Sequence, residues 1–461
     1  MSGLFGPKLA LARAAGAVSR GSGRGGGTTL PGRVLLRLAP DAVARLAARL
    51  PAGSTIVSAT NGKTTTAAMI AAALRAAGRD PVHNRAGSNM SWGVATALLD
   101  QRGEEGLFEV DEAWLPGLAA ELEPRLIVLG NLFRDQLDRY GELERLADEW
   151  ADMVAARTGS TEFALCADDP LVADLGRDRS LSRRPGVTFF GIEDAEQALP
   201  ELSHAFDAKH CRRCGAQYAY ARAFVGHLGH YECRNCGADR PAPDVAATRI
   251  ELRGMAGSVV TVRAGGAEVE LRLPLPGLYN VYNALAALTA ALRLGIEPEP
   301  AARALESMPA VFGRVETIAI DERTIAILLI KNPAGANEVL RTLLLESDSE
   351  ADRGLDLWVA LNDRIADGRD VSWIWDADFE LLAGRVRRVV CAGTRAPEMA
   401  VRLKYAGVAP EAIEVEEAID RSLDRAIATA DGRVFALPTY TALLELRTLL
   451  ARRGVADRYW A

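Results

Sequence analysis

Ser58-Ala-Thr-Asn-Gly-Lys-Thr-Thr-Thr66 is the stretch that decides the fold class of this chain. Residues 55–58, before the turn, predict a short buried strand, and the alanine-rich residues 67–77 predict a helix that stops at Gly78. A glycine–lysine–threonine turn between a strand and a helix can bind phosphate, because backbone N–H groups at a helix N-terminus attract anions. We therefore predict an α/β domain with a nucleotide-binding P-loop.

The side chains of this loop predict how ATP would be held. Lys63 offers a positive charge to the phosphates, and Thr64 is placed to bind a magnesium ion that bridges them. The strict loop pattern begins with glycine, whereas Val57 stands there, so the segment is a variant; a turn with a solvated lysine is the alternative. The predicted ATP-binding residues of the loop are Asn61, Gly62, Lys63, Thr64 and Thr65.

Apolar segments and helical patterns alternate along most of the chain, which is typical of a parallel sheet covered by helices on both faces. Strands are predicted at 126–129, 163–166, 258–262, 269–273, 325–330, 357–361, 386–390 and 433–437. Helices are predicted at 34–50, 67–77, 281–294 and 337–345. The fold class is therefore α/β.

A chain of 461 residues is too long for one ordinary core, so we expect several domains. Residues 1–45 are predicted to be a basic N-terminal segment with a lead-in helix. Residues 46–305 are predicted to be the central ATP-binding domain, and residues 306–461 a Rossmann-like C-terminal α/β domain. The hinge between them is expected near 306–314.

Composition restricts the class of protein. The net charge of −7 argues against a general nucleic-acid binder. Six cysteines are too sparse for a disulfide-rich secreted protein, and no apolar stretch is long enough to span a bilayer, so we expect a cytoplasmic protein. Residues 1–40 carry basic but no acidic side chains. A flexible basic tail is the simple interpretation, and contact with anionic lipid at the inner membrane face is the alternative.

Four of the cysteines form two close pairs. Cys211-Arg-Arg-Cys214 and Cys233-Arg-Asn-Cys236 have the spacing of a zinc ribbon, here inserted at 205–243. Four thiolates leave no open coordination position, which predicts a structural zinc site. Two redox-active pairs are the alternative, but the surroundings do not look like thioredoxin.

Polar residues downstream of the loop are candidate ligands for the metal and the base. Glu109-Val-Asp-Glu112 follows an extended segment, where a carboxylate can contact magnesium or be simply solvated. Gly277-Leu-Tyr-Asn-Val-Tyr-Asn283 opens a helix, and the amides of Asn280 and Asn283 can pair with an adenine edge. Helix capping is the alternative for Asn280.

These segments resemble the Mur ligase superfamily, which joins amines to carboxylates through an acyl phosphate. The resemblance implies that Glu112 binds magnesium together with Thr64, and that Asn283 is the main adenine contact. It also implies that Arg314 reaches the nucleotide phosphates when the domains close. In the segment 131–141, Gln136 replaces the histidine that commonly helps to bind metal in the superfamily. Whether a second metal site exists therefore stays an open question.

Within the superfamily the chain resembles the MurT family over about residues 30–450. The resemblance rests on Thr-Asn-Gly-Lys-Thr, the inserted ribbon and Asp370-Val-Ser-Trp-Ile-Trp-Asp376. It implies that an aspartate of this last loop is needed for activity, orienting a histidine of a partner glutaminase, and both Asp370 and Asp376 fit that role. A polar loop whose tryptophans pack on the core is the alternative.

The resemblance also implies a reaction and a partner. ATP and Mg²⁺ would activate the α-carboxylate of D-glutamate in the lipid II stem peptide, and ammonia from a GatD-type glutaminase would convert it to D-isoglutamine during peptidoglycan synthesis. Cys166 and Cys391 look like small core residues and not glutaminase nucleophiles, so the ammonia would come from outside. The alternatives are an amino-acid-adding Mur ligase, a folylpolyglutamate synthase-like ligase, and a zinc-ribbon ATPase scaffold that ligates nothing. A lipid-linked and a nucleotide-linked precursor both stay open.

Overall fold

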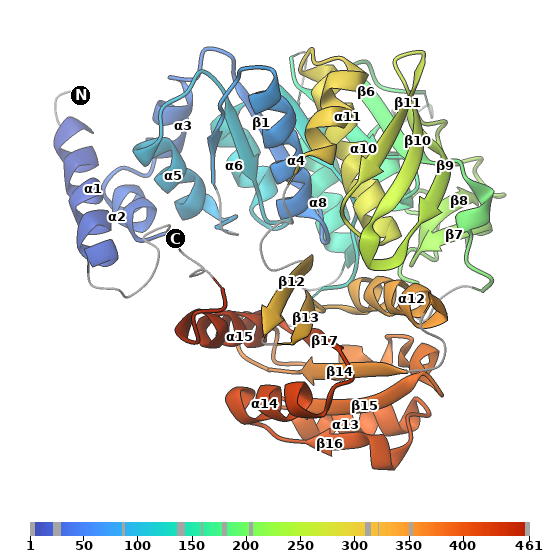
Figure 1. Ribbon diagram of the computed structural model, residues 1–461. Coiled ribbons are helices and arrows are strands. Elements are labelled where there is room, and N and C mark those ends of the chain that lie inside the picture. Colours follow the sequence, from blue (N-terminus) through green and yellow to red (C-terminus); the bar gives the residue numbers. More distant parts are fainter. Residues whose placement is uncertain are drawn as a thin grey trace.

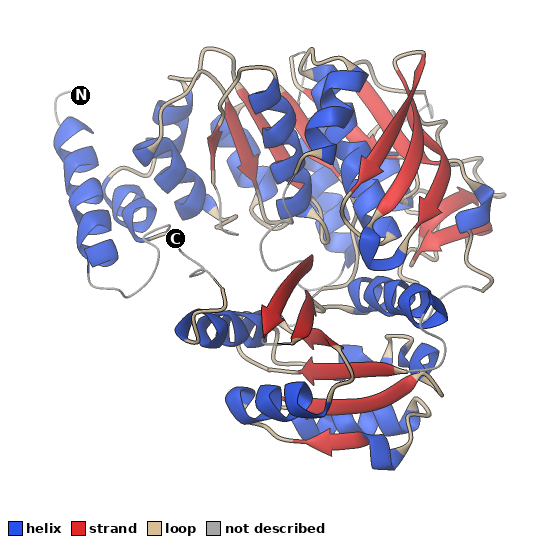
Figure 2. Cartoon of the chain, in the orientation of Figure 1, coloured by secondary structure: helices blue, strands red, loops and turns tan. Residues whose placement is uncertain are grey.

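A computed structural model describes residues 5–21, 29–84, 88–135, 143–157, 160–177, 182–201, 206–308, 315–320, 322–349 and 354–456. These residues form two α/β bodies, which lie one above the other in Figure 1. The strands and helices alternate in both bodies, as Figure 2 shows. The prediction of an α/β fold built on a parallel sheet is confirmed.

The first body contains a nine-stranded sheet in the order β11-β10-β9-β6-β5-β4-β1-β3-β2. Its strands are β1 (Ser54–Ser58), β2 (Val82–His83), β3 (Gly106–Glu109), β4 (Leu126–Leu129), β5 (Glu162–Cys166), β6 (Val187–Ile192), β9 (Val245–Leu252), β10 (Ser258–Ala264) and β11 (Ala267–Leu273). The strands from β2 to β9 are parallel, whereas β9, β10 and β11 pair antiparallel. All five residues of β1 are buried, as expected for a central parallel strand covered on both faces.

Helices cover both faces of this sheet. They are α4 (Lys63–Ala76), α5 (Ser91–Asp100), α6 (Leu115–Leu122), α8 (Leu143–Ala155), α9 (Pro170–Leu175), α10 (Leu278–Arg293) and α11 (Pro298–Glu306). Helices α4, α10 and α11 pack against one another, and α6, α8 and α9 form a second group. The crossovers from β1 to β2 and from β3 to β4 run in opposite directions, and right-handed connections therefore place α4 and α6 on opposite faces.

The second body contains a six-stranded sheet in the order β12-β13-β17-β14-β15-β16. Its strands are β12 (Val315–Ile320), β13 (Arg323–Leu328), β14 (Leu355–Ala360), β15 (Val386–Ala392), β16 (Ile413–Val415) and β17 (Arg433–Pro438). Its helices are α12 (Pro333–Ser349), α13 (Ala396–Tyr405), α14 (Ile419–Thr429) and α15 (Tyr440–Arg452). Short 3₁₀ turns of this body are η3 (Ser372–Trp375), η4 (Phe379–Leu382) and η5 (Pro410–Ala412), whereas η1 (Ala195–Gln197) and η2 (Gly254–Ala256) belong to the first body. Helix α12 faces the upper body, and Ala334 at its start belongs to the upper core.

A separate two-stranded hairpin lies between the two cysteine pairs. It consists of β7 (Ala219–Val225) and β8 (Leu228–Glu232), between β6 and β9 in the chain. Phe224 and Tyr231 of this hairpin belong to the core of the upper body, so the ribbon is packed onto the central sheet domain and does not project freely into solvent.

The N-terminal region differs from the prediction. A flexible tail is wrong for residues 5–21, because these residues form helix α1 (Phe5–Gly21), which buries Phe5, Leu9 and Ala12 against the rest of the body. The single helix predicted at 34–50 is divided into α2 (Leu30–Leu38) and α3 (Ala42–Ala47). Pro40 lies between them, where its missing N–H and its ring would disrupt a continuous helix.

Candidate functional site

The phosphate loop joins the carboxyl end of β1 to the start of α4, as predicted. Gly62 precedes the helix with φ +94, a conformation that favours glycine. A Cβ atom at this position would lie 1.9 Å from Asn283 Oδ1. Glycine is therefore required twice at this position, by the backbone conformation and by the close approach of helix α10.

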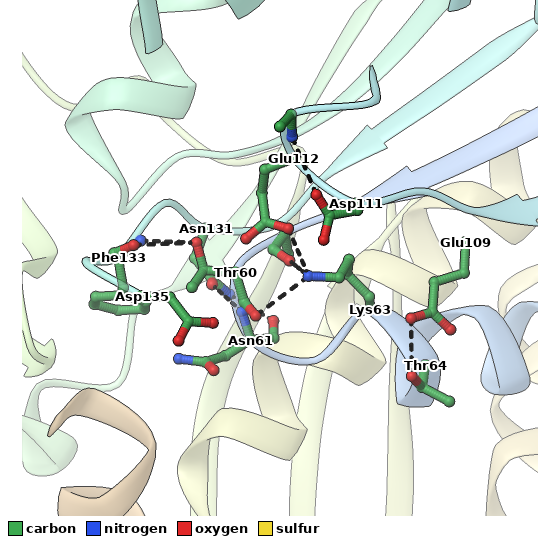
Figure 3. Close-up of polar contacts among 12 residues, drawn as sticks. Thr60, Asn61, Lys63, Thr64, Glu109, Asp111, Glu112, Asn131, Phe133 and Asp135 are labelled. Carbon is green, nitrogen blue, oxygen red and sulfur yellow. Dashed lines mark hydrogen bonds and ion pairs between the residues drawn. The ribbon is translucent and has the colours of Figure 1, made fainter. Parts of the chain in front are cut away.

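Lys63 is buried at the base of the loop and held by three acceptors (Figure 3). Its Nζ donates to the carbonyl of Ala59 at 2.5 Å, to the carbonyl of Thr60 at 3.4 Å and to Glu112 Oε2 at 2.7 Å. Burial alone would lower the pKa of Lys63, but the negative charges of Glu112 and Asp111 outweigh it and raise the pKa above its ordinary value. The lysine therefore stays charged at neutral pH.

The predicted magnesium ligands Thr64 and Glu112 make different contacts. Thr64 Oγ1 donates to Glu109 Oε1 at 3.0 Å, whereas Glu112 pairs with Lys63. Burial alone would raise the pKa of Glu112, yet Lys63 and Lys331 outweigh it, so the carboxyl is ionised. Hydroxyl and carboxylate oxygens are the donors that Mg²⁺ prefers, so this set fits the metal. Glu109, which was not among the predicted ligands, joins the group.

The residues after β4 hold the phosphate loop in place. Asn131 Oδ1 accepts from the backbone N–H of Asn61 at 2.9 Å, and Asn131 Nδ2 donates to the carbonyl of Asn61 at 3.0 Å. The backbone N–H of Phe133 donates to Thr60 Oγ1 at 3.0 Å. The role of Asn131 was missed, although its position directly after a predicted strand is a usual signal for a ligand-side residue.

The second body contacts the same loop. Asn332 exchanges two side-chain hydrogen bonds with Asn61, at 3.2 and 3.0 Å. Lys331 Nζ donates to the carbonyl of Thr60 at 3.1 Å and pairs with Asp135 Oδ2 at 2.5 Å. These partners are separated by up to 271 positions in the chain, so no local pattern could reveal them. The segment after β13 thus joins the two bodies at the phosphate loop.

The two predicted base-binding asparagines lie under this loop. Asn283 Nδ2 donates to Asn280 Oδ1 at 3.0 Å, and Asn283 Oδ1 accepts from Thr66 Oγ1 at 3.3 Å. Asn280 Nδ2 donates to the carbonyl of Pro276 at 2.8 Å, while the N-cap position belongs to Gly277. Helix α10 therefore presents the Asn283 amide to the loop, whereas the Asn280 amide supports Asn283 from behind. Contact of either residue with adenine stays a prediction.

An open cleft lies between the two bodies, next to the phosphate loop. A cleft between two domains is a usual place for a small-molecule ligand. Its lining residues are Asn61, Gly62, Asn131, Phe133, Val225, Leu228, Tyr279, Tyr282, Asn283, Leu329, Lys331, Ala334, Gly335, Glu338 and Val339. The predicted residues Asn61 and Gly62 of the phosphate loop therefore meet the predicted Asn283 of α10 in one cleft, which Lys331 of the second body also lines.

A second cleft adjoins the first and contains the predicted aspartates. Asp370 Oδ1 accepts from the backbone N–H of Ser372 at 2.8 Å, and this bond holds the pKa of Asp370 below its ordinary value. Asp376 Oδ2 lies 3.6 Å from Arg134 Nη2. Both aspartates line this cleft, together with Arg134, Asp135, Lys331, Asn332, Pro333, Asp367, Ser372 and Trp373. The alternative of tryptophans packed on the core holds for Trp373, which is partly buried against the core of the second body, but not for Trp375, which is 51% exposed.

The four paired cysteines come together as predicted. Their sulfur atoms all lie within 4.8 Å of one another, which fits the tetrahedral set of a structural zinc site. The backbone N–H groups of Gly215 and Gly237 donate to the carbonyls of Cys211 and Cys233, at 2.8 and 2.9 Å. These tight turns place the second cysteine of each pair, Cys214 and Cys236, beside the first.

The two isolated cysteines are core residues, as predicted. Cys166 and Cys391 are fully buried, and burial raises the pKa of both thiols, that of Cys391 to about 12. A thiol that is buried and protonated is not an activated nucleophile. Arg314 and Gln136 lie outside the described residues.

Comparison with known proteins agrees with this architecture. Residues 57–291 match the family model of the Mur ligase middle domain, and residues 329–443 match the MurT ligase C-terminal model. The MurT subunit of lipid II isoglutaminyl synthase (glutamine-hydrolysing) from Streptococcus pneumoniae is 33% identical over 94% of this chain and 94% of its own. The same subunit from Staphylococcus aureus is 31% identical over 96% and 97%.

A solved structure shows the same fold. A pseudomurein peptide ligase type C from Methanothermus fervidus superposes with a TM-score of 0.68 at 22% identity, covering 89% of this chain and 80% of its own. The sequence matches extend through the ribbon and both bodies. The chain therefore belongs to the MurT family of Mur ligases.

Proposed function

We propose that this chain is the ATP-dependent ligase subunit of a lipid II isoglutaminyl synthase, which amidates the α-carboxylate of D-glutamate in the stem peptide. The observation that carries this proposal is the contact of the phosphate loop with Lys331 and Asn332, where the two clefts adjoin. The two relatives of nearly equal length carry the name of this synthase.

The reaction has two steps, and the residues of the cleft suit both. In the first step a carboxylate oxygen of the substrate attacks the γ-phosphorus of ATP, which gives an acyl phosphate and releases ADP. Lys63 and the magnesium ion would stabilise the charge that moves with the phosphoryl group, with Thr64, Glu109 and Glu112 as the proposed oxygen donors to the metal. Domain closure at Asn61 and Asn332 would keep water from the acyl phosphate.

In the second step ammonia attacks the acyl carbon. The C–N bond forms, the bond to the phosphate oxygen breaks, and a proton leaves the nitrogen to give the neutral carboxamide. We propose that the ammonia comes from a GatD-type glutaminase subunit, because Cys166 and Cys391 are buried thiols with raised pKa values. Asp370 and Asp376 line an open cleft, and Trp375, which precedes Asp376 in the chain, is exposed; we propose that the partner approaches on this side.

The substrate would be presented at the inner face of the cytoplasmic membrane. Among the helices that the structure describes, none is long and apolar enough to cross a membrane. Helix α1 instead exposes two apolar side chains, Leu11 and Val18, which lie seven positions apart and therefore on one side of the helix. We include peripheral contact of this helix with anionic lipid in the proposal.

The test is an amidation assay on the purified chain with lipid II, ATP and magnesium. Mass spectrometry would follow the conversion of carboxylate to carboxamide with ammonium, with glutamine alone, and with glutamine plus the candidate glutaminase. We expect product with the glutaminase and weaker product with ammonium. If no amide forms, but an added amino acid drives ATP consumption, an amino-acid-adding ligase is the correct function.

A further inference from the structure

The tip of the cysteine ribbon reaches the cleft in which ATP is proposed to bind. Val225 ends β7 and Leu228 begins β8, on either side of the turn Gly226-His227. Both side chains are buried, yet both line the same cleft as Asn61 of the phosphate loop. The ribbon is therefore a wall of the cleft as well as a metal-binding module.

The turn at the tip is held in place by the loop that follows β4. The ring of His227 is fully buried and packs on Phe133, with ring centroids 4.7 Å apart. His227 Nε2 lies 3.4 Å from Asp169 Oδ2, and that carboxylate also accepts from the backbone N–H of Leu132 at 2.8 Å. Asp169 thus lies between the tip and the loop, and the ring contact of His227 with Phe133 packs the tip against that loop.

A second buried carboxylate ties the ribbon to helix α10. Arg240, just after the last cysteine pair, donates from Nε to Asp168 Oδ1 at 2.6 Å, and Tyr282 donates from its hydroxyl to Asp168 Oδ2 at 2.7 Å. The backbone N–H of Gly229 donates to the carbonyl of Asp168 at 2.9 Å. Tyr282 also lines the cleft. Asp168 therefore connects the ribbon, through Arg240 and Gly229, to a residue of the cleft wall.

The cleft has a polar side and an apolar side. Asn61, Gly62 and Asn131 line it near the phosphate loop, whereas Val225, Leu228 and residues such as Val339 of α12 supply apolar surface. A nucleotide matches these two sides. The faces of its heteroaromatic ring would contact the apolar side, and its phosphates would bind to the phosphate loop on the polar side.

We propose that the ribbon tip forms part of the base-binding wall, with Val225 and Leu228 contacting the purine of ATP. Metal binding at the four cysteines then sets the affinity for the nucleotide, because it folds the hairpin that carries these two residues. The inference rests on the proposed function in one respect, namely that ATP occupies this cleft.

Calorimetric titration of the full chain would test the base contact. ADP and inorganic tripolyphosphate would be titrated into the wild type, Val225→Ala, Leu228→Ala and the control Arg222→Ala, which removes an exposed side chain from the same hairpin. Each apolar truncation should weaken ADP binding roughly tenfold. Tripolyphosphate has no base, so its affinity should be unchanged in all variants.

Two outcomes would overturn the base contact. One is ADP affinity equal to that of the wild type in both truncated variants. The other is an equal loss for ADP and tripolyphosphate, which would mean that the truncations disturb the fold. Failure of the proposed function is distinguishable, since the wild type would then bind no ADP or form no amide, whereas failure of the inference leaves both intact.

A metal-depleted sample tests the role of the four cysteines. Zinc would be removed with 1,10-phenanthroline, depletion verified by elemental analysis, and the remaining fold checked by circular dichroism. We expect ADP binding to weaken at least as much as in Leu228→Ala, and zinc addition to restore it. Unchanged ADP affinity in the depleted protein would refute the link, and the two alanine variants still test the contact if depletion unfolds the chain.

Discussion

At the scale of single residues, the pair Lys63–Glu112 shows how the site keeps its charges. Both side chains are buried, and each stabilises the ionised form of the other. Removing one partner of a buried pair costs more than the pair contributes, because the remaining charge is left without compensation. Both residues were predicted from the sequence, but Glu112 was predicted to bind only the metal. No sequence pattern shows that a carboxylate 49 positions away pairs with the lysine.

Glu112→Gln should lower the free energy of unfolding by about 3–5 kcal/mol, since the amide keeps the shape but not the charge. Because the pKa of Glu112 is lowered, its contribution is present above the ordinary value of 4.5 and is lost as pH falls through the lowered value. Because the pKa of Lys63 is raised, its contribution is lost only above the ordinary value of 10.5. The difference between wild type and variant should therefore be flat between about pH 5.5 and 9.5.

Urea denaturation without nucleotide, repeated across this pH range, would measure the difference. Glu104→Gln is the matched control, because Glu104 is an exposed acid on the same body. Equal stability of Glu112→Gln and wild type at pH 7 would contradict the role given to the pair.

At the scale of elements, the close approach of helix α10 supports the phosphate loop. The helix was predicted from its alanine and leucine pattern, and the loop from its glycine and lysine, but their contact was not. Asn283 lies so near Gly62 that it supports the loop from below. The N-terminal helix α1 was missed for a related reason, since its polar and alanine-rich sequence becomes stable through packing against its neighbours.

Gly62→Ala should abolish measurable ADP binding, because the added Cβ would lie 1.9 Å from Asn283 Oδ1 and displace either the loop or helix α10. Gly78→Ala is the matched control. Gly78 has φ +76, but a Cβ there meets no atom within 4 Å, so that variant carries only the backbone strain of about 1–2 kcal/mol. Titration calorimetry and thermal melting of both variants would separate the two effects. Equal ADP affinity in the two variants would show that the contact with Asn283 is unimportant.

At the scale of the whole molecule, the function depends on how two bodies meet. The phosphate loop belongs to the first body, whereas Lys331, Asn332 and both candidate aspartates belong to the second. The boundaries at 45 and 305 remain a proposal, as does the hinge. Trp375, next to Asp376 in the chain, and Tyr405 form an exposed pair with ring centroids 5.9 Å apart, and the proposal places the second subunit on this side of the second body.

Asp370→Asn and Asp376→Asn should affect amidation differently when the nitrogen comes from glutamine and when it comes from added ammonium. If an aspartate acts on the partner glutaminase, its variant should lose roughly 100-fold of the glutamine-dependent rate and keep the ammonium-dependent rate. Asp363→Asn is the control, because Asp363 follows the same strand but bonds to Thr394 and Arg395. Mass-spectrometric amidation rates with each nitrogen source would measure this. A variant with full glutamine-dependent activity removes that aspartate from the proposal.

The sequence by itself determined the features whose physical cause is local. A phosphate loop needs a strand, a glycine turn and a helix, and a zinc site needs two cysteine pairs at fixed spacing, so both can be predicted without knowledge of the rest of the chain. The buried strands were likewise indicated by short apolar runs. Only the tertiary structure decided which of these features meet.

The contact of Asn61 with Asn332, the pairing of Lys63 with Glu112 and the place of the ribbon tip in the cleft all depend on side-chain packing between distant segments. Such contacts follow from the shape of the folded core and from how buried charges find partners. Neither is encoded in the spacing of residues along the chain, and for this reason the site required the structure.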